Sequence, residues 1–478
     1  MDELEKDRSF PSAESFYRRA VAFIEESIRG NKPVTCSQSA EELWSRLNEP
    51  IPFEGRPLDS VLAQLEEQVL THCIRLYHPR YMGHQVSAPL PVAVWMESLI
   101  GAMNQSAAVR EMSPVGTIIE TLVLKWFSSL AGFGAESGGT MTSGGTEATY
   151  TALLAARALA CPRSWEEGVG SATFALVGGE YAHYSVERAA GQLGLGVRNF
   201  IRIPSVDYRM DPERLKEVLD RLHQAGKKVI AVTATAGSTP TGSFDDLEAI
   251  GKICREKELW FHVDGAHGAS ALFSSRRKGR MKGVDIADSL SWDPHKMMLM
   301  PLAAGMLLVR EEEKLQQAFS QSAPYLFHGE GKKRLWDQGL RSFQCSRRND
   351  ALKVWVALQR YGSNGFGTLY DGLCDSAESL YGVLSERNDF QTLHPPESNI
   401  LCFRYLGEKG CSDEKLDLLN RQLRLQFNAG GLGWITVARL NERLALRAVM
   451  MNPQTTIGDI QLVVEELARI GRSIRKRQ

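Results

Sequence analysis

The sequence predicts an α/β protein built around a mainly parallel β-sheet with helices on both faces. Between about residues 100 and 310, short apolar runs alternate with stretches of helical periodicity, such as 146–159 and 245–257. The runs read ATFALV (172–177), VIAVTAT (229–235), LWFHVD (259–264) and GMLLV (305–309). Apolar runs of this length, separated by helices, are typical of parallel strands that are buried on both faces.

The two ends of the chain predict smaller parts. Near the N-terminus, apolar residues from Phe16 to Ile28 recur at helical spacing, and 58–74 has a similar pattern. Toward the C-terminus, a helical stretch at 349–360 meets a glycine-rich break, YGSNGFG, and the chain ends in an amphipathic helix. The expected parts are an N-terminal helical segment (1–80), a large α/β domain (81–345) and a small α+β domain (346–478).

Composition excludes several classes of protein. The chain has 478 residues, of which 43% are hydrophobic and 24% charged, so it is not a disordered, collagen-like or multi-span membrane protein. Its 56 Lys and Arg residues balance 57 Asp and Glu residues, which leaves no overall field for nucleic acid or an anionic membrane. The basic end, GRSIRKRQ, suits the C-terminus of a helix and its dipole better than a nucleic-acid tail.

The cysteines indicate a reducing compartment. All eight are scattered, with no CxxC pair, and no spacing typical of metal ligands occurs. The N-terminus is acidic and polar, and no apolar run reaches membrane-spanning length. We therefore expect a cytoplasmic protein without a metal site, a membrane segment or a nucleic-acid partner.

Three motifs in the α/β part carry groups suited to catalysis. In GTMTSGGTEAT (139–149), Gly144 and Gly145 precede a helix that opens at Thr146, which predicts an anion site at the helix N-terminus. In LWFHVDGAHGAS, Asp264 ends a predicted buried strand, where ligands of parallel sheets bind. In SLSWDPHKMM, Lys296 has an apolar flank that favours a poorly solvated amine, suited to Schiff-base chemistry. Each motif alone is as well explained by a helix entry, a helix cap or a surface lysine.

Together, the three motifs match the needs of pyridoxal phosphate (PLP). Its phosphate needs an anion cradle, its pyridine nitrogen needs a carboxylate and its aldehyde needs an amine. His183 lies in the sequence between the cradle and Asp264, and its imidazole could stack on the cofactor ring or simply cap a helix.

From HPRYMG at 78 to the C-terminal helix, the chain resembles the group II PLP-dependent amino acid decarboxylases. The matching segments are HPRY (78–81), EMSPVG (111–116), SGGTEAT (143–149), HYSVERAA (183–190), TATAGSTPTGSFDDL (233–247), HVDGAHGAS (262–270), DPHKMM (293–298), QCSRR (344–348) and LRAVMMNP (446–453). The resemblance implies a fold type I, aspartate aminotransferase-like large domain with a mainly parallel seven-stranded sheet. It also implies a homodimer with composite active sites.

The resemblance implies a role for each matching residue. Lys296 would bind the cofactor aldehyde, Asp264 would pair with the pyridinium nitrogen, and His183 and Ala266 would contact opposite faces of the ring. The remaining implied contacts are Gly145, Thr146 and His295 to the phosphate, Thr235 near the ring, and Arg447 to the substrate α-carboxylate. His84 and His267 are candidate partners for a charged substrate side chain.

Three departures from the family pattern bear on function. The strand-end motif reads Asp264-Gly265-Ala266-His267, where the family usually has Asp-Ala-Ala and an aromatic residue. Asp293 stands where members with acidic substrates usually carry Asn. The loop HGEGKKRLWDQG (328–339) lacks the tyrosine that in the family returns a proton to the substrate Cα. His328, Lys332, Lys333 or His183 could replace that tyrosine.

The expected activity is α-decarboxylation of an L-amino acid to an amine and CO₂. The segments SAPYLF (322–327) and QCSRR favour an acidic or small polar substrate, of the aspartate, cysteine sulfinate or glutamate type. A decarboxylation-dependent aldehyde synthase is the main alternative. A transaminase or carbon–sulfur lyase carries less weight, and a non-enzymatic interaction protein would leave Lys296, Asp264 and His183 unexplained.

Overall fold

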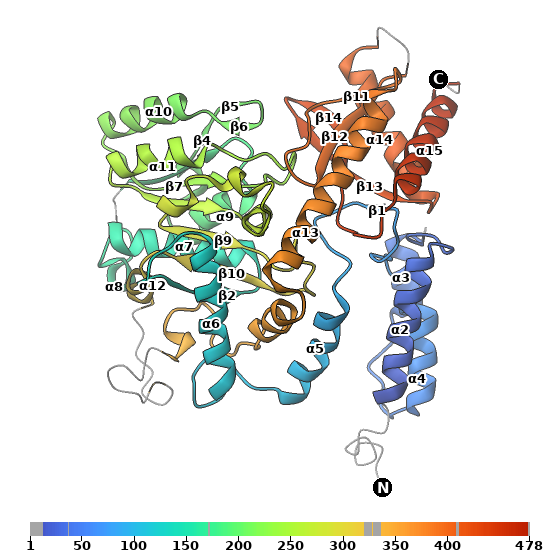
Figure 1. Cartoon of the computed structure of the whole chain (residues 1–478), viewed down its shortest axis with the longest axis horizontal. Helices are drawn as coiled ribbons and strands as arrows, with labels where there is room; N and C mark the ends of the chain where they lie inside the picture. The colour runs from blue at the N-terminus through green and yellow to red at the C-terminus, as the bar shows by residue number, and fades with distance from the viewer. Residues whose placement is uncertain are drawn as a thin grey trace. The chain divides into compact units, whose positions relative to one another are not determined.

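The chain folds into two compact units, each with most of its contacts inside itself, and Figure 1 shows them as ribbons. The computed structural model describes residues 13–36, 38–170, 173–319, 327, 336–407 and 411–476. Unit 1 comprises Met1–Ala88, Ser376–Pro395 and Leu401–Gln478, and unit 2 comprises Pro89–Asp375 and Pro396–Ile400. Within the described ranges, no helix has the length and apolar character needed to cross a membrane.

This division differs from the three expected parts, because the N-terminal segment joins the C-terminal sheet. Strand β1 (Tyr81–Met82) pairs in parallel with β13 (Trp434–Leu440). The backbone N–H of Val34 also donates to the carbonyl of Gly431 at 2.9 Å. Backbone pairing over this sequence separation could not be inferred from composition or periodicity.

Unit 2 contains the seven-stranded sheet, in the order β2-β10-β9-β8-β7-β3-β4. Each neighbouring pair among β9, β8, β7, β3 and β4 is parallel, whereas β10 runs antiparallel to both β9 and β2. The prediction of a mainly parallel sheet is therefore confirmed. The strands are β2 (Gly138–Thr142), β3 (Phe174–Gly179), β4 (Phe200–Ile203), β7 (Lys228–Thr235), β8 (Trp260–Asp264), β9 (Ser289–Trp292) and β10 (Gly305–Val309).

Helices cover both faces of this sheet, because successive side chains of a strand point to opposite faces. On β8, Trp260 belongs to the apolar cluster that includes Ala152 of α7 (Gly145–Ala160). Its neighbour Phe261 faces α11 (Leu247–Glu256), where Gly251 permits close packing. A Cβ at Gly251 would lie 2.9 Å from the Phe261 ring. In Figure 1, α11 and α7 accordingly lie on opposite sides of the sheet.

The other helices of unit 2 surround this framework. They are α5 (Pro91–Met103), α6 (Pro114–Leu130), α8 (Ser164–Glu167), α9 (Tyr184–Gln192), α10 (Pro212–Gln224), α12 (Glu312–Gln317) and the first part of α13 (Ala351–Ser385). A two-stranded hairpin, β5 (Ser205–Val206) and β6 (Arg209–Met210), precedes α10.

The strand directions bring five loops to one edge of the sheet. Because β10 is antiparallel to both of its neighbours, β2 points the same way as the parallel strands. The carboxyl ends of β2, β3, β7, β8 and β9 therefore share one edge. This is the edge where parallel α/β sheets bind their ligands.

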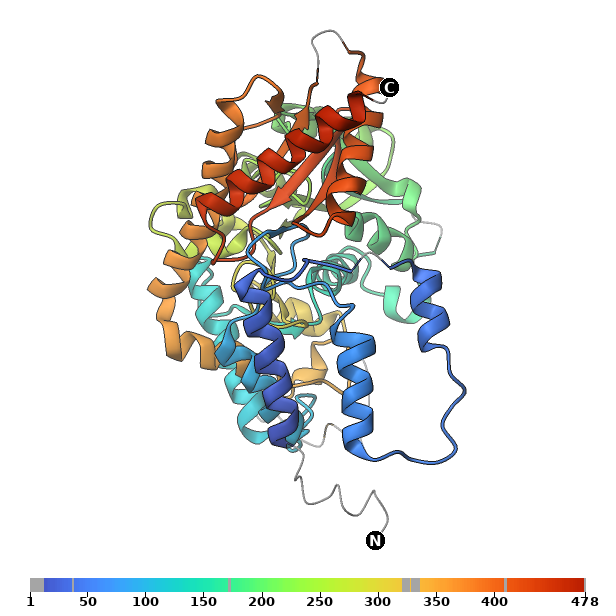
Figure 2. The same ribbon diagram turned by 90° about the vertical axis from the view of Figure 1, so that its right-hand side faces the viewer.

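Unit 1 combines helices with a five-stranded sheet in the order β1-β13-β14-β12-β11. Its apolar core joins Leu401 and Phe403 of the sheet to Leu423 and Leu467 of two helices, and Figure 2 shows the C-terminal helix, in red, lying across the sheet. The elements not yet named are α2 (Ala13–Arg29), α3 (Ala40–Leu47), α4 (Leu58–Leu65), a π-helical turn (Glu66–Leu70), β11 (Phe390–Thr392), β12 (Ile400–Tyr405), α14 (Asp413–Ala429), β14 (Arg443–Val449) and α15 (Ile457–Arg475).

The expected glycine-rich break is confined to one residue. Gly362 has φ 65° and ψ 171°, outside the helical region, while helical structure occupies both sides of it within α13. A positive φ of this size suits glycine, which lacks a Cβ. The other residues of YGSNGFG are helical, because Phe366 is fully buried and tertiary packing outweighs their weak helix propensity.

A buried ion pair fixes the segment QCSRR (344–348) to the sheet. The guanidinium of Arg347, in QCSRR, donates to Glu120 of α6 at 2.7 Å and to the carbonyl of Met141 at 3.0 Å. The backbone N–H of Met141 donates to the same carboxylate at 3.0 Å. The two side chains are only 4% and 1% exposed, so each charge depends on the other.

We therefore expect Arg347→Met to destabilise the protein by about 3 to 5 kcal/mol, since it leaves the Glu120 carboxylate buried without its partner. Urea unfolding at neutral pH measures this change. The double variant Glu120→Gln with Arg347→Met should recover much of the loss, because Gln keeps an acceptor for the Met141 N–H. Arg163→Met, which removes the exposed Arg163–Glu167 pair, should cost less than about 1 kcal/mol. Equal losses for the two single variants would show that burial of the pair does not matter.

Candidate active site

A cavity of about 380 Å³ lies in unit 2 at the carboxyl edge of the large sheet. Nine of the eleven residues expected to contact cofactor or substrate line it: Gly145, Thr146, His183, Thr235, Asp264, Ala266, His267, His295 and Lys296. Ser143, Gly144, Gly237, Thr239, Asp293 and Leu302 complete the lining. The sequence motifs that are separated along the chain thus meet in one place, because each follows a strand that ends at this edge.

The N-terminus of α7 forms one wall, and its glycines make the close approach possible. A Cβ at Gly145 would lie 2.7 Å from the Cβ of Ala266, and one at Gly144 would lie 3.1 Å from the His295 ring. Larger residues would therefore separate the helix from the loops after β8 and β9. The free N–H groups and positive dipole of a helix start form a suitable cradle for a phosphate.

Asp264 is held in a fixed orientation at the end of β8. It is 7% exposed, and Oδ1 accepts hydrogen bonds from the Ser291 hydroxyl at 3.0 Å and from the Ala266 N–H at 3.2 Å. Asp264 and Ser291 are paired across β8 and β9. The sequence reasoning missed Ser291, because its significance depends on which strands are neighbours. Its only signal was its place five residues before Lys296, in the motif SLSWDPHKMM.

His183 caps α9 and also lines the cavity, and its stacking on a cofactor ring stays a prediction. Its Nδ1 accepts the backbone N–H of Ser185 at 3.3 Å, at the start of α9. A neutral ring that accepts at Nδ1 carries its proton on Nε2. Burial lowers the pKa of His183, and the nearby Asp264 carboxylate opposes part of that effect. The neutral imidazole is thus favoured near neutral pH.

Lys296 lies beside the Asp293 carboxylate and is followed by a buried apolar segment. Its Nζ is 3.1 Å from Oδ2 of Asp293, and that oxygen is 3.4 Å from Nε2 of His295. The following residues Met297, Met298, Leu299 and Met300 are at most 1% exposed, as the apolar flank predicted. Burial lowers the pKa of His295, and its Nδ1 accepts the N–H of Ala304 at 3.1 Å.

These groups fit pyridoxal phosphate. The helix start and its glycines offer an anion cradle, Asp264 is a fixed carboxylate, and Lys296 is an amine at the same cavity. The buried Thr235 Oγ1 has no hydrogen-bond partner among the described residues, so a bound group could satisfy it. Asp293 is the exception, because it adds a carboxylate where the phosphate would be held.

His267, the departure in the strand-end motif, lies in the cavity wall at 3% exposure. Its Nε2 is 2.7 Å from Oδ1 of Asn399. Because that amide oxygen accepts, the Nε2 of His267 must carry the hydrogen. Asn399 was not found from the sequence, since it lies 132 residues away and belongs to none of the recognised motifs.

Arg447 and His84 belong to unit 1, where they are neighbours of β13. Arg447 pairs with Thr436 across β14 and β13 and donates to its hydroxyl at 3.3 Å. The backbone N–H of His84 donates to the Tyr81 hydroxyl at 3.3 Å. Burial, reinforced by Arg447 and Arg424, lowers the pKa of His84. Their predicted contacts with substrate stay predictions, and residues 328–335, with His328, Lys332 and Lys333, lie outside the described residues.

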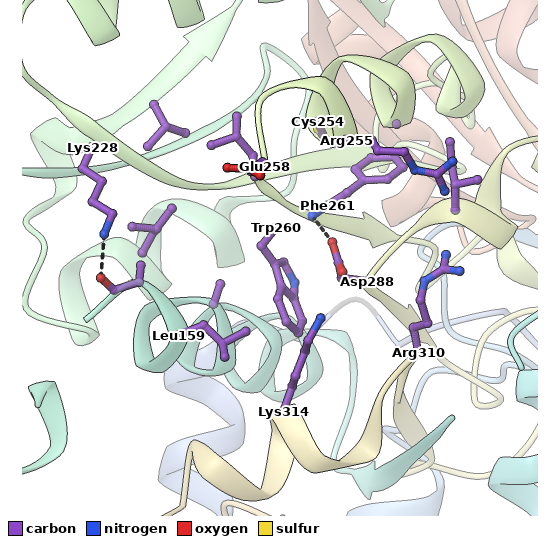
Figure 3. Close-up of a pocket in the computed structure, with 17 residues that line it drawn as sticks. Leu159, Lys228, Cys254, Arg255, Glu258, Trp260, Phe261, Asp288, Arg310 and Lys314 are labelled. Carbon is purple, nitrogen blue, oxygen red and sulfur yellow. Dashed lines mark hydrogen bonds between the residues drawn. The ribbon is translucent and has the colours of Figure 1, made fainter. Parts of the chain in front are cut away.

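A larger hollow, of about 550 Å³, lies at the opposite edge of the same sheet (Figure 3). Three of its four cationic side chains bond to the protein itself. Lys228 donates to the carbonyl of Ala160 at 2.8 Å, Lys314 to Glu311 at 2.7 Å, and Arg310 to the carbonyl of Ala287 at 3.0 Å. This hollow lacks the convergence of an amine, a carboxylate and a helix start. The smaller cavity is therefore the candidate active site.

Comparison with known proteins identifies the family. Residues 41–406 match the model of the pyridoxal-dependent decarboxylase conserved domain. The chain belongs to the pyridoxal-dependent decarboxylase family. It is therefore a PLP-dependent amino acid decarboxylase, a carboxy-lyase. Among the described residues, no group of His, Cys, Asp and Glu side chains is placed to hold a metal ion.

Individual relatives differ in what their names say they act on. The chain is 30% identical over 456 residues to acidic amino acid decarboxylase GADL1 of Xenopus tropicalis, covering 93% of this chain and 89% of that protein. It is 26% identical over 449 residues to the aromatic-L-amino-acid decarboxylase of Bacillus atrophaeus, covering 93% and 92%. The crystal structure of mouse CSAD superposes with a TM-score of 0.90 at 26% identity, covering 96% of this chain and 98% of that one. The predicted fold type I architecture is thereby confirmed.

Proposed function

We propose that the enzyme removes the α-carboxylate of an L-amino acid with an acidic or small polar side chain, releasing CO₂ and the amine. The likeness to GADL1 over most of both chains supports the acidic class. The imidazole of His267 lies in the cavity wall, where its Nε2–H is engaged by Asn399, so it would meet a substrate anion through a protonated Nδ1. A carboxylate or sulfinate on the substrate needs such a polar partner, since a buried anion without one is costly.

In this proposal, each cavity residue has a separate role in binding the cofactor or in catalysis. PLP supplies an electron sink for the bond that breaks at the substrate α-carbon. Lys296 would hold the cofactor's aldehyde carbon, while the start of α7, with Gly145, Thr146 and His295, would hold its phosphate. Asp264 would keep a proton at the pyridine nitrogen, with its carboxylate oriented by Ser291. His183, Ala266 and Thr235 would contact the ring and exclude water.

Asp264→Asn tests the electrostatic part of this assignment. We expect a fall in kcat of about a hundredfold or more, because Asn has the shape of Asp without the charge that retains the pyridinium proton. Bound PLP, measured by its visible absorption, should remain. Thermal unfolding provides the control, since losing only the hydrogen bonds would shift stability by about 1 kcal/mol and spare kcat. A near-normal kcat would contradict the role.

A substrate screen tests the proposed class and product. We expect CO₂ release from at least one of aspartate, cysteine sulfinate, cysteate and glutamate, at a higher kcat/KM than from any aromatic amino acid. Efficient turnover of aromatic amino acids alone would overturn the proposal. Amine, aldehyde, ammonia and peroxide should be measured against CO₂ in the presence of oxygen. Amine equal to CO₂ is the expected result.

The aldehyde synthase remains a second candidate because of one observation. No tyrosine occurs between residues 328 and 339, so the usual proton donor of that loop is absent from the sequence. A positioned donor contributes about 10² to 10⁴ in rate, and without a substitute the reaction could be diverted by oxygen. Aldehyde and ammonia equal to CO₂, with oxygen consumed, would favour this function.

We also propose that the active protein is a homodimer. In the single chain, the N-terminal helices of unit 1 expose apolar side chains: Phe16 is 48% exposed, Tyr17 42% and Trp44 69%. Single exposed apolar residues are common, but a series along α2 and α3 suits a surface that a partner covers.

Trp44→Glu should weaken this dimer, because it would place a charge in an apolar interface. Light scattering at micromolar concentration should give the dimer mass for the unaltered protein and a lower average mass for the variant. Glu41→Gln, an exposed change on the same helix, serves as the control and should leave the mass unchanged. An unaltered protein that is monomeric and active would contradict the proposal.

A further inference from the structure

Asp293 is the least expected group in the phosphate cradle. It directly follows β9, and its side chain is only 2% exposed. Its Oδ2 is 3.1 Å from Lys296 Nζ and 3.4 Å from His295 Nε2. The carboxylate therefore points into the cavity, toward two of the groups that the cofactor uses, and not away into solvent.

The same carboxylate lies against the start of α7. A Cβ built on Gly145 would be 3.1 Å from Asp293 Oδ2, and one built on Gly305 would be 2.8 Å from Oδ1. Oδ1 is buried and has no hydrogen-bond partner among the described residues. One oxygen thus contacts the Lys296 amine and the His295 ring, while the other has no donor among the described residues, in a place where a helix dipole favours an anion.

A phosphate in this cradle would need the same positive groups. It carries between one and two negative charges near neutral pH, and it would draw on the N–H groups at the start of α7 and on His295. With Asp293 present, these groups would be shared between two anions in a poorly solvated space. Like charges that are buried close together disfavour each other strongly.

We infer that Asp293 competes with the phosphate of PLP for the positive groups of the cradle and thereby weakens cofactor binding. The enzyme then exchanges its cofactor, and the fraction in the active form follows the concentration of free PLP. A neutral side chain of the same size at this position would hold the phosphate without that competition. Asp293 thereby lowers the fraction of the enzyme that holds PLP at a given PLP concentration.

Asp293→Asn tests this inference without measuring turnover. Apoprotein is titrated with PLP, with inorganic phosphate and with pyridoxal, and each dissociation constant is measured by the change in protein fluorescence. We expect PLP and phosphate to bind roughly ten- to a hundredfold more tightly to the variant. Pyridoxal, which lacks the phosphate, should change by less than about threefold.

Glu147→Gln is the matched control. Glu147 lies in the first turn of the same helix, is half-buried, and accepts from the Ser143 N–H at 2.9 Å and from the Gln344 amide at 2.7 Å. Water and salt screen its charge more than that of Asp293, which is 2% exposed, so its loss should change PLP affinity by less than about threefold. An equal gain for Glu147→Gln would show that any nearby charge has the same effect, which would overturn the specific role of Asp293.

Two other outcomes would also overturn it. Weaker PLP binding by Asp293→Asn would mean that the carboxylate chiefly orders Lys296 and His295. Equal gains for PLP and pyridoxal would place the effect on Lys296 alone and not on the phosphate. Circular dichroism checks that the variant is folded, and Asp293→Ser, neutral and smaller, provides the same comparison if Asn is not tolerated.

Discussion

The direction of the strands in the large sheet is the constraint on which the active site depends. Thr142, Thr235, Asp264 and Trp292 each end a strand at the same edge, so the loops that follow them must meet. The reversed strand β10 preserves this arrangement, because two antiparallel pairings return β2 to the common direction. A single reversal at β2 would have moved the glycine cradle to the far edge, away from Lys296.

Much of this arrangement could be predicted because its signals are local. The strand that ends at Asp264 was bounded to within a residue by its apolar run, and the helix after Gly144 began where the glycines indicated. The roles of Lys296, Asp264 and the cradle followed from chemistry that one cofactor requires. Periodicity and motif order indicated the large unit, the cradle, Asp264 and Lys296, whereas the family resemblance implied the other predicted lining residues, such as Thr235 and Ala266.

What escaped prediction depends on distant parts of the chain. Ser291 matters only because β9 lies beside β8, and Asn399 only because a short segment far along the sequence lies against His267. The glycine-rich stretch around Gly362 was expected to end a helix, yet packing of Phe366 holds the helix together beyond one kinked residue. The sequence showed that Asp293 departs from the family pattern, but it could not show that the carboxylate points toward Lys296.

The pairing of β1 with β13 also has a consequence for synthesis of the protein. Tyr81 meets Trp434 in the finished sheet, so more than 350 residues must leave the ribosome before the N-terminal segment finds its partner strand. Contacts of such separation form late and slowly. During that interval the apolar faces of the first helices remain uncovered, whereas the large unit already has its complete sequence. The N-terminal segment is thus the part of the nascent chain that most needs a chaperone.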